Sequence, residues 1–274
     1  MFRPGIFSDT FLESFRNKMF LFFFVASSLC IGSIALAMNM DVVNGVMEGY
    51  TLFGESVPIP KMTVVEFVQN IQAGLAMLIA TIGLLLALFA TSTLFPQMVQ
   101  KGSIELLLCR PVPRWRIISA RFLGGAAIMA FNAAYLFIGV WLVLGLKSGI
   151  WTRGFPLSTF LVIFAFVVLF SVVMTACVIS ENGPVGLLFS FMLFVFSPIL
   201  AAHERITPAF SKELYRQVFR FLYWVVPKTA ETIGSARRLI LEQPLEIGMI
   251  AGTSAAFALA CWAISIVYFA RKDY

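Results

Sequence analysis

Six apolar segments of about 18 to 30 residues take up most of this chain and constrain its fold more than any other feature. A helix needs about 20 apolar residues to cross a bilayer, and a membrane barrel would need alternating polar and apolar residues, which the sequence lacks. The chain is 60% hydrophobic and 12% charged, against about 45–50% and 25% in soluble proteins. We therefore predict an all-α membrane protein, one domain over residues 1–274 with a six-transmembrane-helix bundle whose spans are residues 19–38, 67–94, 117–146, 157–179, 185–202 and 247–270.

The cysteines, the histidine and the net charge do not indicate a metal site or nucleic-acid binding. His203, the only histidine, is interpreted as an interfacial polar residue because no second ligand is visible near it. The net charge of +6 is better explained by topology and lipid headgroups than by nucleic acid. The cysteines are scattered and are predicted to be small packing residues without a disulfide framework: Cys30, Cys109, Cys177 and Cys261.

Residues 2–18 precede the first span and carry apolar side chains at helical spacing. Thr10 and Glu13 have the spacing of a capping box, so we predict an amphipathic helix that lies on the membrane. A cleaved signal peptide is the alternative, since Ala35 and Ala37 form a small-x-small site after the apolar run. The amphipathic helix is favoured because a signal peptide would not need that pattern in its charged region.

The connections between the spans are predicted to differ in character. Residues 39–62 are expected to form an irregular acidic loop. Residues 180–184, with the sequence Ser-Glu-Asn-Gly-Pro, predict a tight turn that makes the fourth and fifth spans antiparallel neighbours. Residues 209–226 and 229–242 carry apolar and basic residues on opposite faces, so both are predicted to be amphipathic surface helices.

Several polar side chains lie within the predicted spans. Gln69, Asn70 and Gln72 are expected at the wet interface, with a pathway through the membrane as the alternative. Asn132 lies in mid-span, where we favour an interhelical hydrogen bond over substrate contact. Arg121 is expected to extend its side chain back to the membrane surface.

The connection between the second and third spans carries the most informative local pattern. Gly102 can break the preceding helix, and Ser103 can cap a new one whose first turn favours Glu105. Pro111 and Pro113 then stop that helix because neither can donate a backbone hydrogen bond. These signals predict a helix of roughly two turns.

The side chains of this short helix predict that it docks on another protein. Ile104, Leu107 and Leu108 share one side, and Glu105 lies on another. Basic residues follow at the end of the helix, namely Arg110, Arg114 and Arg116. Because connections within helical bundles usually have about 2 to 8 residues, this longer one is predicted to insert into a groove on a soluble partner.

Charge counting gives only partial information on orientation. Six spans would place both termini and the connection after the second span on one side of the membrane. That side carries ten of the 20 Lys and Arg residues, so the count is a tie. Seven of the opposing ten lie in one long connection, from Arg205 to Arg238. Since the positive-inside rule applies to short loops, we predict cytoplasmic termini.

The motif Gly102-Ser103-Ile104-Glu105-x-Leu107-Leu108-x-Arg110-Pro111-Val112-x-Arg114, followed by Arg121-Phe122-Leu123-Gly124, resembles the same connection in the ABC-2 family of ABC transporter permeases. The resemblance implies a prokaryotic inner-membrane protein in which two six-span subunits, identical or homologous, dimerise. It also implies a coupling helix, here Ser103 to Arg110, that docks on a separate ATP-hydrolysing subunit. The residues predicted to make this coupling are Gly102, Ser103, Ile104, Glu105, Leu107, Leu108, Arg110, Pro111 and Arg114.

The sequence has no phosphate-binding loop of the Gly-x4-Gly-Lys-Ser/Thr type. ATP and magnesium are therefore expected on the partner subunit, and this chain is predicted to carry no cofactor, metal or catalytic residue. We favour a permease of an ATP-driven exporter. The alternative is a scaffold that uses the same ATPase for mechanical or maturation work on an extracytoplasmic partner, through the surface from Arg205 to Arg238. An uncoupled membrane anchor is a third hypothesis.

Overall fold

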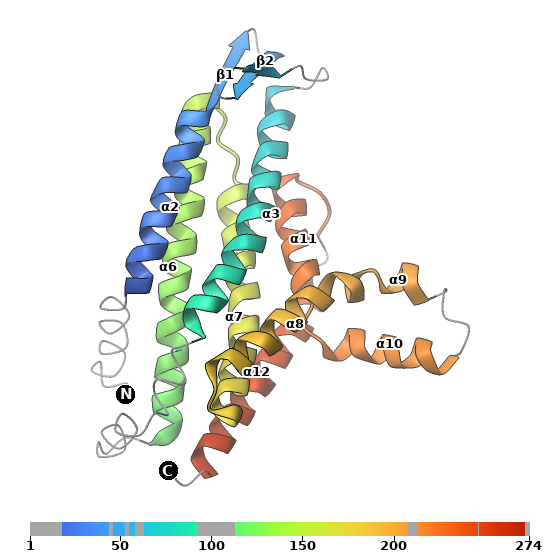
Figure 1. The fold of residues 1–274 in the computed structure, drawn as a ribbon. Helices are drawn as coiled ribbons and strands as arrows, with labels where there is room; N and C mark the ends of the chain where they lie inside the picture. Colours follow the sequence, from blue (N-terminus) through green and yellow to red (C-terminus); the bar gives the residue numbers. More distant parts are fainter. Residues whose placement is uncertain are drawn as a thin grey trace.

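The computed structural model describes residues 18–43, 46–52, 55–57, 63–92, 113–207, 213–245 and 247–271. The predicted N-terminal amphipathic helix lies almost entirely outside these residues. Helices and a small sheet make up the described chain (Figure 1). Its helices are α2 (Lys18–Ala37), α3 (Val64–Thr91), α6 (Arg114–Ser148), α7 (Gly154–Ser180), α8 (Gly183–Ala201), α9 (His203–Ile206), α10 (Glu213–Val225), α11 (Thr229–Ile240) and α12 (Ile247–Arg271).

Five of these helices are long and apolar enough to cross a bilayer: α3, α6, α7, α8 and α12. The apolar stretch of α2 that meets this description is shorter, Leu21–Ala37. The predicted helical, multi-pass architecture is therefore confirmed, while the sixth crossing stays a prediction. The start of α3 has a local cause, because Thr63 and Glu66 form a capping box in which each side chain accepts the other's backbone N–H.

The prediction of an irregular loop after the first span was wrong. Its residues form a three-stranded antiparallel sheet in the order β1 (Met38–Val43), β2 (Val46–Leu52) and β3 (Glu55–Val57). Met38 pairs with Leu52, and the register shifts between Asp41 and Val42. The strands contain four Val residues and one each of Thr and Tyr, which favour extended structure. The acidic residues and glycines had concealed this pattern.

Helix α7 lies at the centre of the bundle and contacts α3, α6, α8, α11 and α12. Two thirds of its most apolar stretch is buried. Several of its hydroxyl groups bond to its own backbone: Ser158 Oγ donates to the Phe155 carbonyl oxygen at 2.6 Å and Ser171 Oγ to that of Val168 at 2.6 Å. These bonds satisfy polar groups that have no water available in an apolar interior.

The turn between α7 and α8 confirms the predicted antiparallel pair. Glu181 adopts a left-handed conformation, with φ of 55°, and its N–H donates to the Cys177 carbonyl oxygen at 2.8 Å. Gly186 then allows α8 to approach α7 closely, because an added Cβ would lie 2.3 Å from Cys177 Sγ and 2.8 Å from the Val173 carbonyl oxygen. Pro184 near the start of α8 suits a position whose N–H needs no helical partner.

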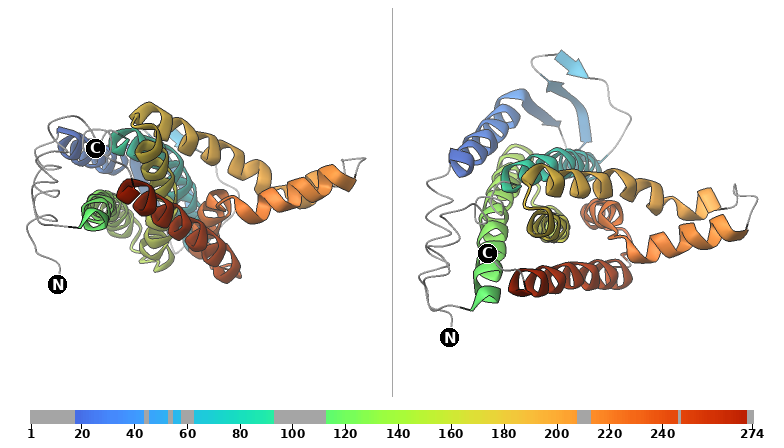
Figure 2. Two further views of the ribbon diagram at one scale, coloured as in Figure 1. Left: turned by 90° about the horizontal axis from the view of Figure 1, so that it is seen from below. Right: turned by 60° about the horizontal axis from the view of Figure 1, so that its bottom comes forward.

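The C-terminal part of α8, together with α9 and α10, reaches away from the other helices as a lateral arm, whereas α11 returns into the bundle (Figures 1 and 2). None of the described side chains of α10 is buried, as predicted for a surface helix. The same prediction for residues 229–242 was wrong, because α11 packs against α7, α3 and α8. Its buried residues are Thr229, Thr232, Ile233, Ser235, Ala236 and Ile240.

The ends of most of the long helices lie at one or the other of two opposite ends of the molecule. The end of α3, the start of α6, the α7–α8 turn and the end of α12 lie toward the lower end of Figure 1. The sheet lies at the opposite end, where the end of α6 and the start of α7 also lie. The end of α3 and the start of α6, which flank residues 93–112, therefore lie at the same end of the molecule as the end of α12.

Candidate coupling site

Most residues predicted to couple the chain to an ATPase lie outside the described residues. These are Gly102, Ser103, Ile104, Glu105, Leu107, Leu108, Arg110 and Pro111, and their role stays a prediction. Arg114 is described, as the first residue of α6, and its side chain is half-buried. The structure therefore describes the frame of the predicted coupling site, namely the end of α3 and the start of α6.

The end of α3 is held inside the protein. Thr91 and Ser92 are buried, and Thr91 Oγ1 donates to the Ala87 carbonyl oxygen at 2.8 Å. The Ser92 N–H donates to the Leu88 carbonyl oxygen at 3.0 Å. The thiol of Cys177, from the end of α7, lies 3.8 Å from the Ser92 carbonyl oxygen. The helix that enters the predicted coupling connection is thus fixed against α7.

The start of α6 is also enclosed by protein. Pro113 is extended at the N-cap, and its carbonyl oxygen accepts the Arg116 N–H at 2.9 Å. The six residues from Ile117 to Phe122 are all buried, although one face of a helix would include only about half of such a run. The segment Ile117–Phe122 is therefore covered on all sides, whereas Trp115 in the first turn is exposed.

Arg121 belongs to this enclosed segment, and its predicted extension to the surface was wrong. Only 8% of the Arg121 surface is exposed. Burial of a guanidinium is tolerated where protein groups surround and bond it. Arg114 and Arg116 lie nearer the helix start, and the guanidinium carbon of Arg116 is 5.3 Å from the centroid of the Trp115 ring.

Three stacked aromatic rings connect the first part of α6 to α7 at the centre of the bundle. Phe122 of α6 stacks on Phe170 of α7 with ring centroids 5.3 Å apart, and Phe170 stacks on Phe166 at 5.3 Å. All three rings are buried. Because a close-packed interior transmits displacement, a movement of the α6 start would reach α7 directly. Nothing in the sequence except its many phenylalanines indicated this stack of rings.

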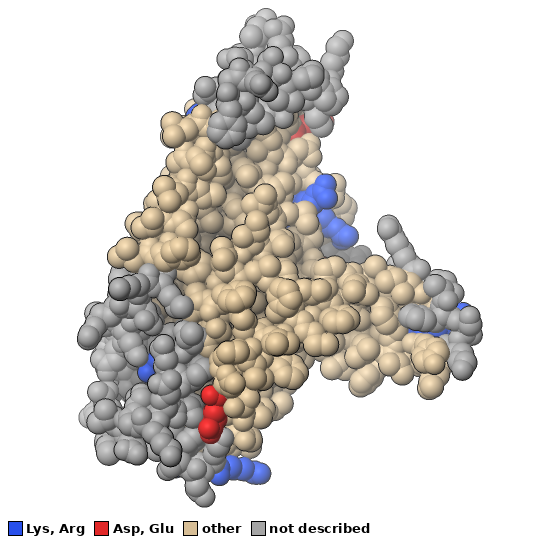
Figure 3. All heavy atoms as spheres, in the orientation of Figure 1, with Lys and Arg blue, Asp and Glu red and all other residues tan. Residues whose placement is uncertain are grey.

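The charges of the described surface lie mainly toward the ends and the arm. In the view of Figure 3, the described surface between the two ends carries few Lys, Arg, Asp or Glu atoms. Basic side chains on α11 include Arg237 and Arg238, both exposed. A broad uncharged belt with charges outside it fits a protein that crosses a bilayer.

The polar residues of α3 are placed differently from one another. Gln72 is 0% exposed, contrary to the predicted interface position, and its Oε1 accepts a hydrogen bond from Thr152 Oγ1. The Thr152 carbonyl oxygen accepts the indole N–H of Trp141 at 2.7 Å. Gln69 Nε2 donates to Glu242 Oε1 at 3.2 Å. These amides tie α3 to the α6–α7 connection and to the end of α11.

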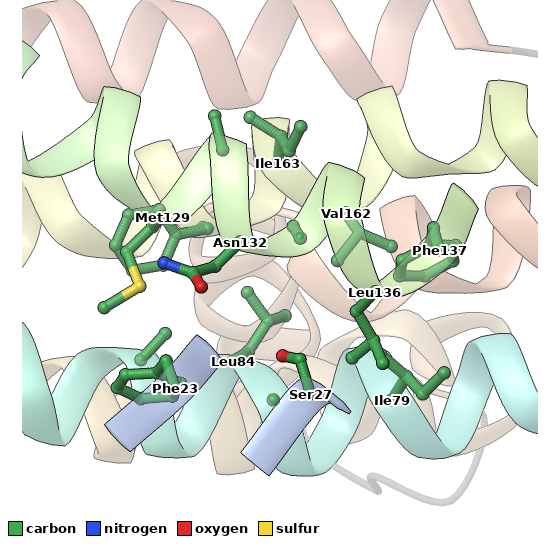
Figure 4. A pocket seen from close by; sticks show the side chains of 15 residues that line it. Phe23, Ser27, Ile79, Leu84, Met129, Asn132, Leu136, Phe137, Val162 and Ile163 are labelled. Carbon is green, nitrogen blue, oxygen red and sulfur yellow. The ribbon is translucent and has the colours of Figure 1, made fainter. Parts of the chain in front are cut away.

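Asn132 does not make the predicted interhelical hydrogen bond. Its Nδ2 donates to the Ile128 carbonyl oxygen of its own helix at 3.1 Å, and its Oδ1 is buried without a hydrogen-bond partner. The side chain lines a cavity of about 70 Å³ between α2, α3, α6 and α7 (Figure 4). Ser27 also lines this cavity, and the sequence alone had not singled it out.

A second polar cluster lies where the arm meets the bundle. The His203 ring stacks on Tyr223 with centroids 3.7 Å apart, and Lys228 Nζ lies 4.1 Å from the centroid of the same Tyr223 ring. Burial lowers the pKa of Lys228, and the Glu231 carboxylate partly opposes that shift. Across the described ranges, no three His, Cys, Asp or Glu side chains gather in a group that could hold a metal ion.

Comparison with known proteins identifies the family. The family model for the ABC-2 family transporter protein matches residues 6–274. The chain belongs to the ABC-2 family of transporter proteins. The match includes residues 93–112, where the predicted coupling motif lies. A search of curated proteins gives no match. Membership of this family makes the chain an integral, multi-pass membrane subunit of an ABC transporter, for which an ABC ATPase is the general partner.

Proposed function

We propose that this ABC-2 protein is the permease subunit of an ATP-driven exporter and that residues 102–114 dock on a separate ATPase subunit. The observation that carries this proposal is the enclosed segment Ile117–Phe122 near the start of α6, joined to α7 through Phe122 and Phe170. A force applied at residues 102–114 would act on a helix whose buried segment Ile117–Phe122 cannot move without its neighbours. The proposal includes α2 as the first of six spans, cytoplasmic termini and an inner-membrane location.

The proposed mechanism is a rigid-body movement of packed helices. Helix α6 has 35 residues, which corresponds to roughly 50 Å at 1.5 Å per residue. It is thus longer than the hydrocarbon core of about 30 Å and extends beyond it. Closure of the ATPase around nucleotide would displace the coupling helix, and α6 and α7 would then rock together across a dimer of identical or homologous permeases.

Charge reversal at the coupling site tests this proposal. In the double variant Glu105→Arg with Arg114→Glu, we expect capture of the partner ATPase to fall at least tenfold, which corresponds to about 1.4 kcal/mol of binding free energy. The measurement is co-purification of the ATPase with the membrane-extracted permease. Arg220→Glu on the exposed face of α10 is the control, because it reverses a charge far along the chain. Undiminished capture by the double variant would refute the docking proposal.

A scaffold function is the second candidate, and the arm favours it. Helix α10 projects with large apolar side chains exposed, among them Leu214, Phe221 and Trp224. An extracytoplasmic partner would meet α10 rather than the whole surface from Arg205 to Arg238, since α11 is packed in the bundle. ATP-dependent solute movement in vesicles that hold both subunits supports export. ATP hydrolysis without solute movement, together with a partner lost on mutation of α10, supports the scaffold.

A further inference from the structure

The described residues that line the cavity between α2, α3, α6 and α7 are all uncharged. Its walls are mainly aromatic and aliphatic, with Phe23, Leu84, Phe137 and Phe166 among them. Among the described residues, Asn132 and Ser27 are the polar side chains that line it. Figure 4 shows the Asn132 amide and the Ser27 hydroxyl directed into the same space from α6 and α2. The cavity therefore combines an apolar body with a small polar feature.

Asn132 is 4% exposed, and its two polar atoms are in different situations. The Nδ2 group donates a hydrogen bond to the Ile128 carbonyl oxygen at 3.1 Å. The Oδ1 atom is a strong acceptor with no hydrogen-bond partner. A buried acceptor without a donor is costly in an apolar interior, and a helical bundle can avoid that cost simply by placing an apolar residue there. The unused acceptor thus points to a ligand that supplies a donor.

The size and charge of the cavity limit what that ligand can be. A volume of about 70 Å³ exceeds the roughly 10–15 Å³ that one water molecule needs, and the pocket is open on one side, so it has room for a small organic molecule. A charged ligand would be buried without a counter-charge, which is strongly unfavourable. Water alone would leave most of the apolar wall against a polar solvent, since only two side chains offer hydrogen bonds.

We propose that this cavity binds a small, uncharged molecule with an apolar body and one hydrogen-bond donor, of which a short-chain alcohol is the simplest example. The ligand hydroxyl donates to Asn132 Oδ1 and exchanges a second hydrogen bond with Ser27 Oγ. Its carbon chain packs against the aromatic and aliphatic walls. This site lies within one subunit and needs neither the ATPase nor transport, so it goes beyond the proposed permease function and does not depend on it.

Photolabelling in lipid nanodiscs tests the site on the full chain. The probe is butanol that carries a diazirine, and its comparison compound is butane that carries the same diazirine without a hydroxyl. We expect the alcohol to label cavity residues such as Phe23, Met129 and Val162 at least tenfold more than the hydrocarbon does, as read by peptide mass spectrometry. Unlabelled butanol should compete with this labelling.

Two variants and a matched control complete the experiment. Asn132→Leu should remove the preference for the alcohol. Asn70→Leu is the control, because the exposed Asn70 donates to the Glu66 carbonyl oxygen of its own helix at 2.8 Å just as Asn132 does to Ile128, but away from the cavity. Gly83→Leu should block labelling by filling the cavity, and the first atom of its side chain has room, because an added Cβ there lies 3.9 Å from Ile79 Cγ2, its nearest neighbour.

The outcomes decide the proposal in either direction. Selective alcohol labelling that Asn132→Leu and Gly83→Leu both abolish, and that Asn70→Leu retains, supports it. Absence of labelling at the cavity residues indicates a site that holds only water or none, and overturns it. Equal labelling by both probes, unchanged in Asn132→Leu, indicates a non-selective apolar crevice and also overturns it. None of these results bears on ATPase capture, which tests the permease function separately.

Discussion

Helices α10 and α11 are neighbours in the chain, and both are amphipathic, yet the protein uses them in opposite ways. No described side chain of α10 is buried, whereas half of α11 lies inside the bundle against α7, α3 and α8. The apolar face of α10 consists of large side chains, including Phe221 and Trp224. The buried face of α11 is built largely from Thr, Ser and Ala.

Side-chain size explains this difference. Small residues let two helix backbones approach closely, and their hydroxyl groups can bond to backbone carbonyl oxygens. Thr232 Oγ1 donates to the Lys228 carbonyl oxygen at 2.9 Å, and Ser235 Oγ to that of Glu231 at 2.8 Å. The approach is close enough that a Cβ on Gly154 of α7 would lie 2.6 Å from the Leu239 carbonyl oxygen. Amphipathic periodicity thus predicts that the apolar face of a helix is covered. The size of the side chains on that face decides whether other helices of the same chain can cover it.

The largest expected effect comes from truncating one apolar residue on each helix. Ile240 of α11 is 0% exposed and belongs to the main hydrophobic core, so Ile240→Ala should lower the free energy of unfolding by about 2–5 kcal/mol. Phe221 of α10 is 67% exposed, so Phe221→Ala should change it by less than about 0.5 kcal/mol. Thermal unfolding in one detergent measures both. Similar losses in the two variants would contradict the contrast between the helices.

A smaller effect is expected from closing the gap between α7 and α11. Gly154→Ala should cost about 1–3 kcal/mol, because the added methyl group meets backbone atoms of Leu239 and Ile240. Gly234→Ala on α11 is the matched control, since nothing lies within 4 Å of an added Cβ there, and it should gain up to about 1 kcal/mol in helix propensity. Hydrogen exchange of the α11 amides should rise only in Gly154→Ala. Unchanged exchange in that variant would show that the contact is not close in solution.

The smallest effect concerns the junction between α10 and α11, where Lys228 is buried. Its pKa is lowered in the folded state by burial. Between that lowered pKa and the ordinary lysine value, the unfolded chain binds a proton that the folded chain does not, so stability should rise as the pH rises through this window. Lys228→Met should remove that rise and, at neutral pH, add up to about 1 kcal/mol, because the lost cation–π contact offsets part of the gain.

The dependence of the unfolding midpoint on pH measures this effect at the junction. Arg220→Met is the control, since it removes one positive charge from the exposed part of α10 without removing a buried amine. The wild-type protein and this control should share the same slope at alkaline pH, and only Lys228→Met should flatten it. A slope that persists in Lys228→Met would assign the pH dependence to another group.

The sequence predicted the coupling site as a motif of residue types, but it did not predict how the residues around that site pack. The family, now shown by the match over residues 6–274, was evident from a short run of residue types around Gly102 and Pro111. The packing that gives the site a mechanical role, with Phe122 on Phe170, had no separate signal among 29 phenylalanines. Arg121 was wrongly predicted to lie at the surface for a related reason. A basic side chain near a helix end usually reaches water, and only packing by neighbouring elements can bury it.

The sequence by itself determined the membrane-embedded helices, because a long apolar run has only one way to satisfy its backbone in a bilayer. It also determined the tight turn before α8, since Asn-Gly-Pro limits the backbone locally. The tertiary structure alone decided that α11 enters the bundle, that Gln72 is buried and that Asn132 faces a cavity. These outcomes depend on how side chains from distant segments fit together, and such fits are set by shape and close packing rather than by hydrophobic pattern.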